Sequence, residues 1–154
     1  MLRPRTAAIL LLLLSVSCDR AWRGDGPPDT LVGTAWVGTN QAREERVDIV
    51  FDDIAMMTDV REDGSFTEEG DADMVFSSPS DTLFYSGTYI YQRTPSSLPQ
   101  DVDYGEVTFH LFEEETGDGV VCRMTFHNMR FYLSFRGSSY PTDRIEDSWV
   151  SSGQ

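Results

Sequence analysis

Cysteine, histidine and lysine are scarce in this 154-residue chain, which has two cysteines, two histidines and no lysine. One pair of cysteines, Cys18 and Cys122, cannot build a framework of several disulfides, so an apolar core has to stabilise the fold. The two histidines, His110 and His127, and so few cysteines make no zinc-binding signature. No serine stands in a Gly-x-Ser-x-Gly sequence, which would mark a catalytic nucleophile. We therefore expect no catalytic residue, no cofactor, no metal site and no enzymatic activity.

Positive charge is also scarce, because 26 Asp and Glu residues outnumber 12 Arg residues and the formal net charge is −14. A surface this acidic is repelled by the phosphates of nucleic acids. It is equally repelled by the headgroups of anionic lipids. The charge therefore predicts that no nucleic acid is a partner of this protein.

The sequence has no apolar run long enough to cross a bilayer. A transmembrane helix needs roughly 20 apolar residues. The run Ile9–Leu14 is much shorter; Arg3 and Arg5 precede it, and Ser15-Val16-Ser17 follows it. A basic start, a short apolar stretch and small residues before a cleavage point are the parts of a secretory signal peptide. Residues 1–17 are therefore predicted to be a signal peptide, and its removal would bring the net charge to about −16.

The segment Leu14–Cys18 resembles the lipobox of bacterial lipoproteins, with Leu14 one place earlier than is usual. In those proteins the cysteine is lipidated and becomes the first residue of the mature chain. The resemblance implies that Cys18 carries a fatty-acyl (palmitate-type) anchor to a membrane. It also implies a location in the cell envelope, facing the periplasm or the cell exterior. The alternative is ordinary secretion with cleavage near Ser17, which would leave Cys18 free or disulfide-bonded.

The remaining 137 residues suffice for one domain with its own core. Residues 18–30 begin at the lipidated cysteine and are rich in Gly, Pro and Asp, which predicts a flexible tether. Residues 31–150 are predicted to form the domain. Residues 151–154 are predicted to be a frayed, disordered tail.

Apolar and polar residues alternate with a period of two along this domain, and no window holds a three-turn amphipathic helix. Val107, Phe109 and Leu111 alternate with polar residues, and Cys122 shares one face with Met124. This alternation is typical of strands with one buried and one solvated face, and it predicts that Cys122 is a buried apolar residue. The predicted strands are residues 31–38, 47–51, 54–60, 72–77, 82–92, 107–111, 120–126, 129–135 and 145–150.

Turn-forming residues separate these strands. Asp63-Gly64 and Gly117-Asp118-Gly119 can supply the positive φ angles of tight turns. The proline-containing segment 94–99 cannot continue a central strand. Short strands joined by short turns predict an all-β fold, a small antiparallel up-and-down β-barrel of about eight strands, because closure removes exposed strand edges. A two-sheet β-sandwich is the competing architecture.

Three segments resemble lipocalin-like domains. Leu31–Trp36 is similar to their first-strand Gly-x-Trp region, Tyr85–Tyr91 is similar to their Gly-x-Tyr strand, and Met129–Phe135 occupies the place of a late strand. The resemblance covers about residues 31–150 and is to the lipocalin-like barrels of exported Bacteroidetes lipoproteins. It implies an up-and-down barrel with Trp36 near the closed end, and it implies no catalytic residues.

Acidic residues crowd two parts of the chain, residues 52–73 and 113–118. Calcium takes six to eight oxygen ligands, so an acidic loop could hold it, but the spacing of an EF-hand is absent and a solvated loop is the favoured interpretation. Paired carboxylates also leave a hydrolase as the weakest of the functional alternatives.

The tyrosines of residues 82–92 carry the leading functional hypothesis. Tyr85, Tyr89 and Tyr91 share one strand face, opposite Phe84 and Ile90. If the tyrosines point inward beside an open mouth, Tyr89 and Tyr91 would line a pocket for a small ligand, since an eight-stranded barrel has room for one. If side chains fill the interior instead, the favoured alternative is a structural or protein-interaction module of a cell-envelope complex.

Overall fold

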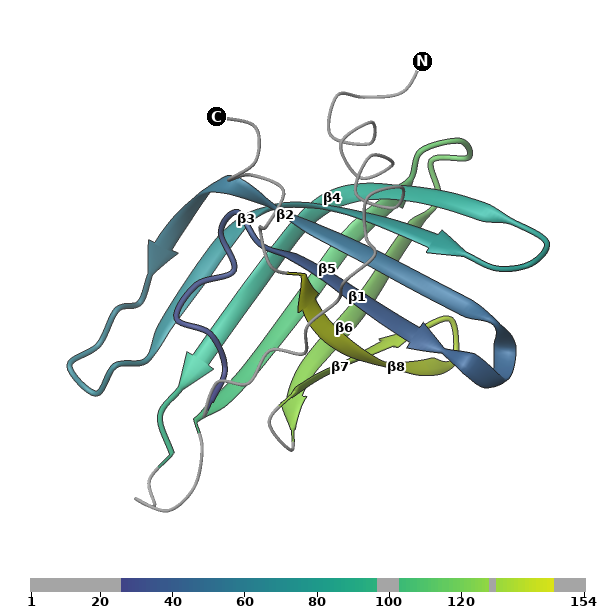
Figure 1. Cartoon of the computed structure of the whole chain (residues 1–154). Coiled ribbons are helices and arrows are strands. Elements are labelled where there is room, and N and C mark those ends of the chain that lie inside the picture. Colours follow the sequence, from purple (N-terminus) through teal and green to yellow (C-terminus); the bar gives the residue numbers. More distant parts are fainter. Residues whose placement is uncertain (1–25, 97–102, 128–129, 146–154) are drawn as a thin grey trace, which may run out of the picture.

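Eight antiparallel strands in sequential order form a closed barrel (Figure 1). The computed structural model describes residues 26–96, 103–127 and 130–145. Each strand pairs with the next, and β1 pairs with β8, which closes the sheet. The all-β barrel is thereby confirmed, and the two-sheet alternative is wrong. The strands are β1 Ala35–Asn40, β2 Glu45–Thr58, β3 Phe66–Ser77, β4 Thr82–Thr94, β5 Tyr104–Glu113, β6 Gly119–His127, β7 Arg130–Phe135 and β8 Ser138–Ile145, with a 3-10 helix η1 Gln41–Arg43.

The predicted alternation determines which side chains enter the barrel. In β5, Val107, Phe109 and Leu111 are buried. His110, which lies between two of them, and Phe112, which follows them, are exposed. The same holds in β6 and β7, so that one apolar cluster runs through the interior. Burial of this apolar surface is the main term that stabilises such a fold.

One long strand replaces two short predicted ones. Residues 47–51 and 54–60 were expected as separate strands, but β2 is continuous from Glu45 to Thr58. Its pairing with β3 shifts between Phe51 and Ala55, which is a β-bulge. The bulge contains Asp52-Asp53, residues that resemble a turn in the sequence. A bulge bends a strand without ending it, which explains why the pattern was misread.

Two glycine turns lie where the sequence predicts them. Gly64 (φ +89°) lies between β2 and β3, and Gly117 (φ +78°) lies between β5 and β6. The amide of Gly64 donates to the carbonyl of Arg61 (3.0 Å), and the amide of Gly117 donates to that of Glu113 (2.8 Å). Both conformations are readily available to glycine and strained for other residues.

Several predicted features lie outside the described residues. They are the signal peptide 1–17, Cys18, most of the strand 145–150 and the tail 151–154. The predicted strand 31–38 begins only at Ala35. In the part of the chain that the structure describes, no helix has the length and apolar character needed to cross a bilayer.

Candidate functional site in the barrel interior

Tyr89 and Tyr91, the two residues expected to line a pocket, lie on β4 and point into the barrel, where both are fully buried. The hydroxyl of Tyr89 donates to a carboxylate oxygen of Glu68 (2.7 Å). The hydroxyl of Tyr91 donates to the backbone carbonyl of Pro28 (2.6 Å). Each hydroxyl therefore has a partner within the protein.

Burial raises the pKa of both tyrosines above the usual value, because the ionised phenolate loses its solvation in the interior. The hydrogen bond to Glu68 raises the pKa of Tyr89 further, since the negative carboxylate favours the neutral phenol. Both hydroxyls thus remain protonated donors at ordinary pH.

Glu68, on β3, is a buried carboxylate with three donors. Besides Tyr89, the backbone amide of Leu31 donates to one oxygen (3.0 Å) and the hydroxyl of Thr30 donates to the other (2.6 Å). A buried carboxylate is costly unless such bonds satisfy it. Glu68 therefore fastens the segment that precedes β1 to the inside of the barrel wall.

Sequence reasoning missed this role of Glu68 and grouped the residue with Glu69 as part of an acidic loop. Alternation along β3 is the signal that could have identified it, because residues an even number of positions apart share a strand face. Glu68 is on the same face as Ala72 and Met74, which point inward. Glu69 has the opposite parity and is only half-buried.

Residues 27–31, the N-terminal plug, close the end of the barrel where β4 finishes and β5 begins (Figure 1). Pro27, Pro28 and Leu31 are buried there. Gly105 makes the approach possible, because a Cβ at this position would lie 2.7 Å from the Cβ of Pro27. Residues 27–30 were expected in the flexible tether. In the structure they belong to the plug that packs on the barrel, so the tether is shorter than predicted.

An ion-pair bridge supports the outside of the plug. The guanidinium of Arg93 contacts the carboxylates of Asp29 and, at 3.0 Å, of Asp103. Asp29 is exposed, and a solvated pair of this kind contributes at most about 1 kcal/mol. The bridge positions the plug more than it stabilises the fold.

Aromatic rings from distant walls meet in the middle of the barrel. Phe51 of β2 lies 5.8 Å from Phe109 of β5 between ring centroids, and Tyr91 of β4 lies 6.3 Å from Phe131 of β7. Trp36 packs edge-on against Phe131 at 5.3 Å. These distances are those of rings in contact, so aromatic side chains from facing walls meet across this part of the interior.

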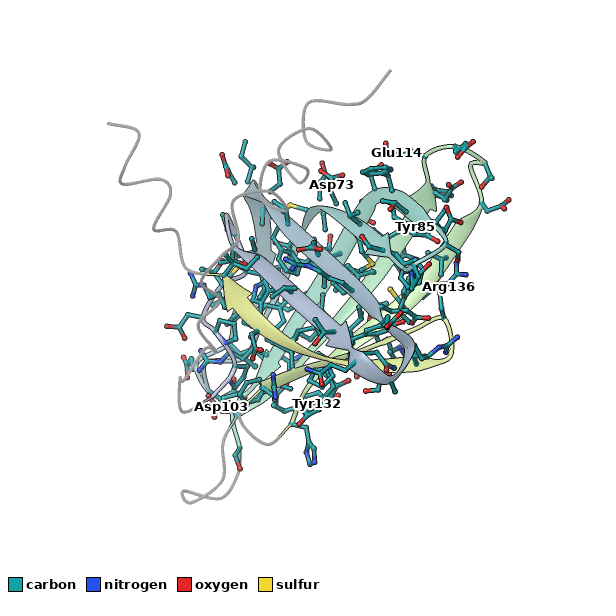
Figure 2. The ribbon with its side chains drawn as sticks, turned by 45° about the vertical axis from the view of Figure 1, so that its right-hand side comes forward. Asp73, Tyr85, Asp103, Glu114, Tyr132 and Arg136 are labelled. Carbon is teal, nitrogen blue, oxygen red and sulfur yellow. The ribbon has the colours of Figure 1, made fainter. Side chains whose placement is uncertain are left out.

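The opposite end is closed by a second aromatic cluster. Phe135 of β7 contacts Phe76 of β3 (5.8 Å) and Tyr85 of β4 (5.5 Å). The guanidinium carbon of Arg136 lies 4.7 Å above the ring of Phe76, in cation–π contact. Figure 2 shows Tyr85 and Arg136 toward this end and Asp103 toward the plug end.

The thiol of Cys122 also lies inside the barrel, as predicted, and burial raises its pKa to about 12. The thiol is therefore neutral and inert at ordinary pH. His110 and His127 are exposed on the outer face. Among the described residues, no group of three or more His, Cys, Asp or Glu side chains is arranged to hold a metal ion.

An open groove of about 300 Å³ lies outside the interior, between the β2–β3 turn and the ends of β4 and β5. Its lining includes Asp59, Arg61, Asp63, Arg93 and Tyr104. The lining is largely polar and charged, and it does not include Tyr89 or Tyr91, the residues predicted to line a pocket.

Comparison of the chain with protein-family models, with curated proteins and with solved structures found no match.

Proposed function

We propose that the protein is a non-enzymatic interaction module of the cell envelope, held to a membrane through a lipid on Cys18. The observation that carries the proposal is the contact of aromatic rings across the barrel interior. A binding site for a small molecule needs a cavity of roughly 300 Å³ or more with a few polar groups free to orient the ligand.

Two further observations favour interaction over ligand carriage. The hydroxyls of Tyr89 and Tyr91 are committed to Glu68 and Pro28, so they are not free to bind a ligand. Both ends of the barrel are also covered, one by the N-terminal plug and the other by Phe76, Tyr85 and Phe135. Function is then left to the outer surface.

The proposed anchor depends on the order of segments along the chain. A basic start, a short apolar run and small residues precede Cys18, and the plug begins nine residues later at Pro27. Nine residues span at most about 30 Å. An anchored Cys18 would therefore keep the barrel within contact distance of other envelope proteins.

The proposal can be tested in cells by placing a photo-crosslinking amino acid at exposed outer positions of the full-length protein, such as Met56, Phe112 and Val121. We expect discrete adducts in the membrane fraction, and we expect Cys18→Ala to release the protein from that fraction and abolish them. Mass spectrometry should find the acyl group on Cys18.

The contrary result is equally concrete. If no position gives an adduct, and a small apolar probe such as anilinonaphthalene sulfonate binds saturably and loses binding in Tyr89→Ala, the barrel is a ligand carrier and the proposal is wrong.

A further inference from the structure

The second half of β2 has a strand on one side only. β1 pairs with residues 45–50 of β2, whereas β3 pairs with residues 46–51 and, beyond the bulge, with residues 55–58. Among the described residues, no strand pairs with the other side of Ala55–Thr58. The barrel is closed, and yet β2 continues past the closure as an edge strand.

The edge exists because the chain before β1 turns inward. The amide of Phe51 donates to the carbonyl of Thr34, and the amide of Gly33 donates to that of Asp52, both at 2.9 Å. A turn follows, in which the amide of Thr34 donates to the carbonyl of Leu31. The chain on the N-terminal side of this turn enters the barrel as the plug, so none of the residues that the structure describes continues beside β2.

Apolar side chains are exposed along this edge. The exposed fractions are 80% for Ile54, 60% for Met56, 47% for Met57 and 70% for Val60. Met56 and Met57 are neighbours in one strand, so their side chains point to opposite faces. An added strand would lie beside β2, with its side chains next to Met56 on one face of the sheet and next to Met57 on the other. The unpaired backbone groups of an edge strand are the template for such pairing, and exposed apolar side chains favour it.

The charge around the edge selects the partner. Residues 52–63 include the acidic Asp52, Asp53, Asp59, Glu62 and Asp63 against one Arg61. A second copy of this chain would bring the same acidic surface and a net charge of −14 to the contact. Anionic lipid would be repelled for the same reason. A segment with basic residues among apolar ones is complementary.

We propose that the edge of β2 at residues 53–58 binds an extended segment, basic and apolar, of a partner protein by strand addition. The backbone of that segment would pair with β2, and its apolar side chains would cover the face of the sheet that carries Met56. The inference rests on the proposed function in taking a protein as the partner.

The test uses purified full-length protein in detergent and a fluorescent nine-residue peptide of alternating Val and Arg. We expect saturable binding by fluorescence anisotropy, with slower hydrogen exchange at the amides of residues 53–58. Two control peptides separate the causes. Replacing Arg by Glu tests charge, and methylating alternate amides removes the backbone donors along one edge. Each should weaken binding at least about tenfold, a change of about 1.4 kcal/mol.

Matched variants locate the site. Met56→Glu should weaken binding at least about tenfold, whereas Phe112→Glu should leave it unchanged. Met56 and Phe112 are almost equally exposed, at 60% and 58%, but Phe112 on β5 is paired on both sides, with Ser86 and with Gly119. Because both substitutions are on the surface, both proteins should keep their unfolding midpoint.

Several outcomes would overturn the inference. They are absence of peptide binding, equal binding of the methylated peptide, and protection outside residues 53–58. Protection of these residues by neutral phosphatidylcholine vesicles but not by the peptide would make the edge a membrane contact instead. Concentration-dependent dimers lost in Met56→Glu would make it a contact between copies.

The cell-based crosslinks separate this inference from the proposed function. Adducts at Phe112 or Val121 with none at Met56 would leave the interaction module standing and refute the edge as its docking surface. Absence of adducts at every position would refute the function itself.

Discussion

Replacing Glu68 by Ala is the sharpest test of the closed end. The substitution removes the acceptor of three hydrogen bonds, from Tyr89, Leu31 and Thr30. The hydroxyl of Thr30 can turn to water because this residue is exposed. The donors of Tyr89 and Leu31 are buried and would be left without a partner.

Each orphaned buried donor costs about 1–3 kcal/mol, so two cost about 2–6 kcal/mol. Loss of the buried charge offsets part of this cost. We therefore expect Glu68→Ala to lower the free energy of unfolding by about 2–4 kcal/mol. Tyr89→Phe removes one bond to a charged acceptor and should lower it by about 1.5–3 kcal/mol.

The double variant shows whether these costs share one origin. With Glu68 already replaced, Tyr89→Phe removes an orphaned hydroxyl, so it should be neutral or stabilising. Urea unfolding, with the midpoint and the slope fitted separately, measures all four proteins of the cycle. Glu69→Ala, the neighbour with opposite parity, is the matched control and should stay within about 0.5 kcal/mol of the parent. The reasoning would be refuted if Glu68→Ala and Glu69→Ala lowered the free energy of unfolding equally. It would also be refuted if Tyr89→Phe lowered it equally in the parent protein and in Glu68→Ala.

Further predictions concern four other positions. Trp36→Ala should lower the free energy of unfolding by about 3–5 kcal/mol in urea titrations, because the ring is 1% exposed. Native Cys122 should resist a thiol reagent that labels it promptly in urea. Gly105→Ala should displace Pro27 and cost about 1–3 kcal/mol, with faster hydrogen exchange in the plug. Burial, then the bond to Glu45, raises the pKa of Tyr140 from 10.0 to about 12. The contribution of Tyr140 to the stability of the fold is therefore complete below pH 10 and is lost as the pH rises toward 12. Over this pH range, the urea midpoint should fall less steeply in Tyr140→Phe than in the parent protein.

The barrel could be predicted because its signal is local. Val107, Phe109 and Leu111 alternate with solvated residues, and this period of two decides burial wherever a strand has one wet face. Cys122 follows the same rule. The bulge in β2 escaped prediction because Asp52-Asp53 has turn-like composition, and only pairing with β3 shows that the strand continues.

The closed end could not be predicted, because it depends on contacts between residues far apart in sequence. Glu68 and Thr30 are 38 positions apart, and Tyr91 and Pro28 are 63 apart. The sequence left open which face of β4 turns inward. The tyrosines do turn inward, but Tyr91 bonds to Pro28 of the plug, and Tyr89 bonds to Glu68, which itself binds the plug residues Thr30 and Leu31. The Gly, Pro and Asp composition of that segment predicted a tether instead.

The pairing of β1 with β8 has a kinetic consequence. Ala35 pairs with Ile145 and Gly38 with Thr142, so the seam joins residues more than one hundred positions apart. Closing so long a loop costs entropy before any seam contact is gained, and folds dominated by such pairings are slow. The seam cannot form until β8 has been synthesised. We expect the hairpins to appear in order along the chain and the seam to close last, so the open sheet, with β1 and β8 unpaired at its two edges, is the species most exposed to aggregation during folding.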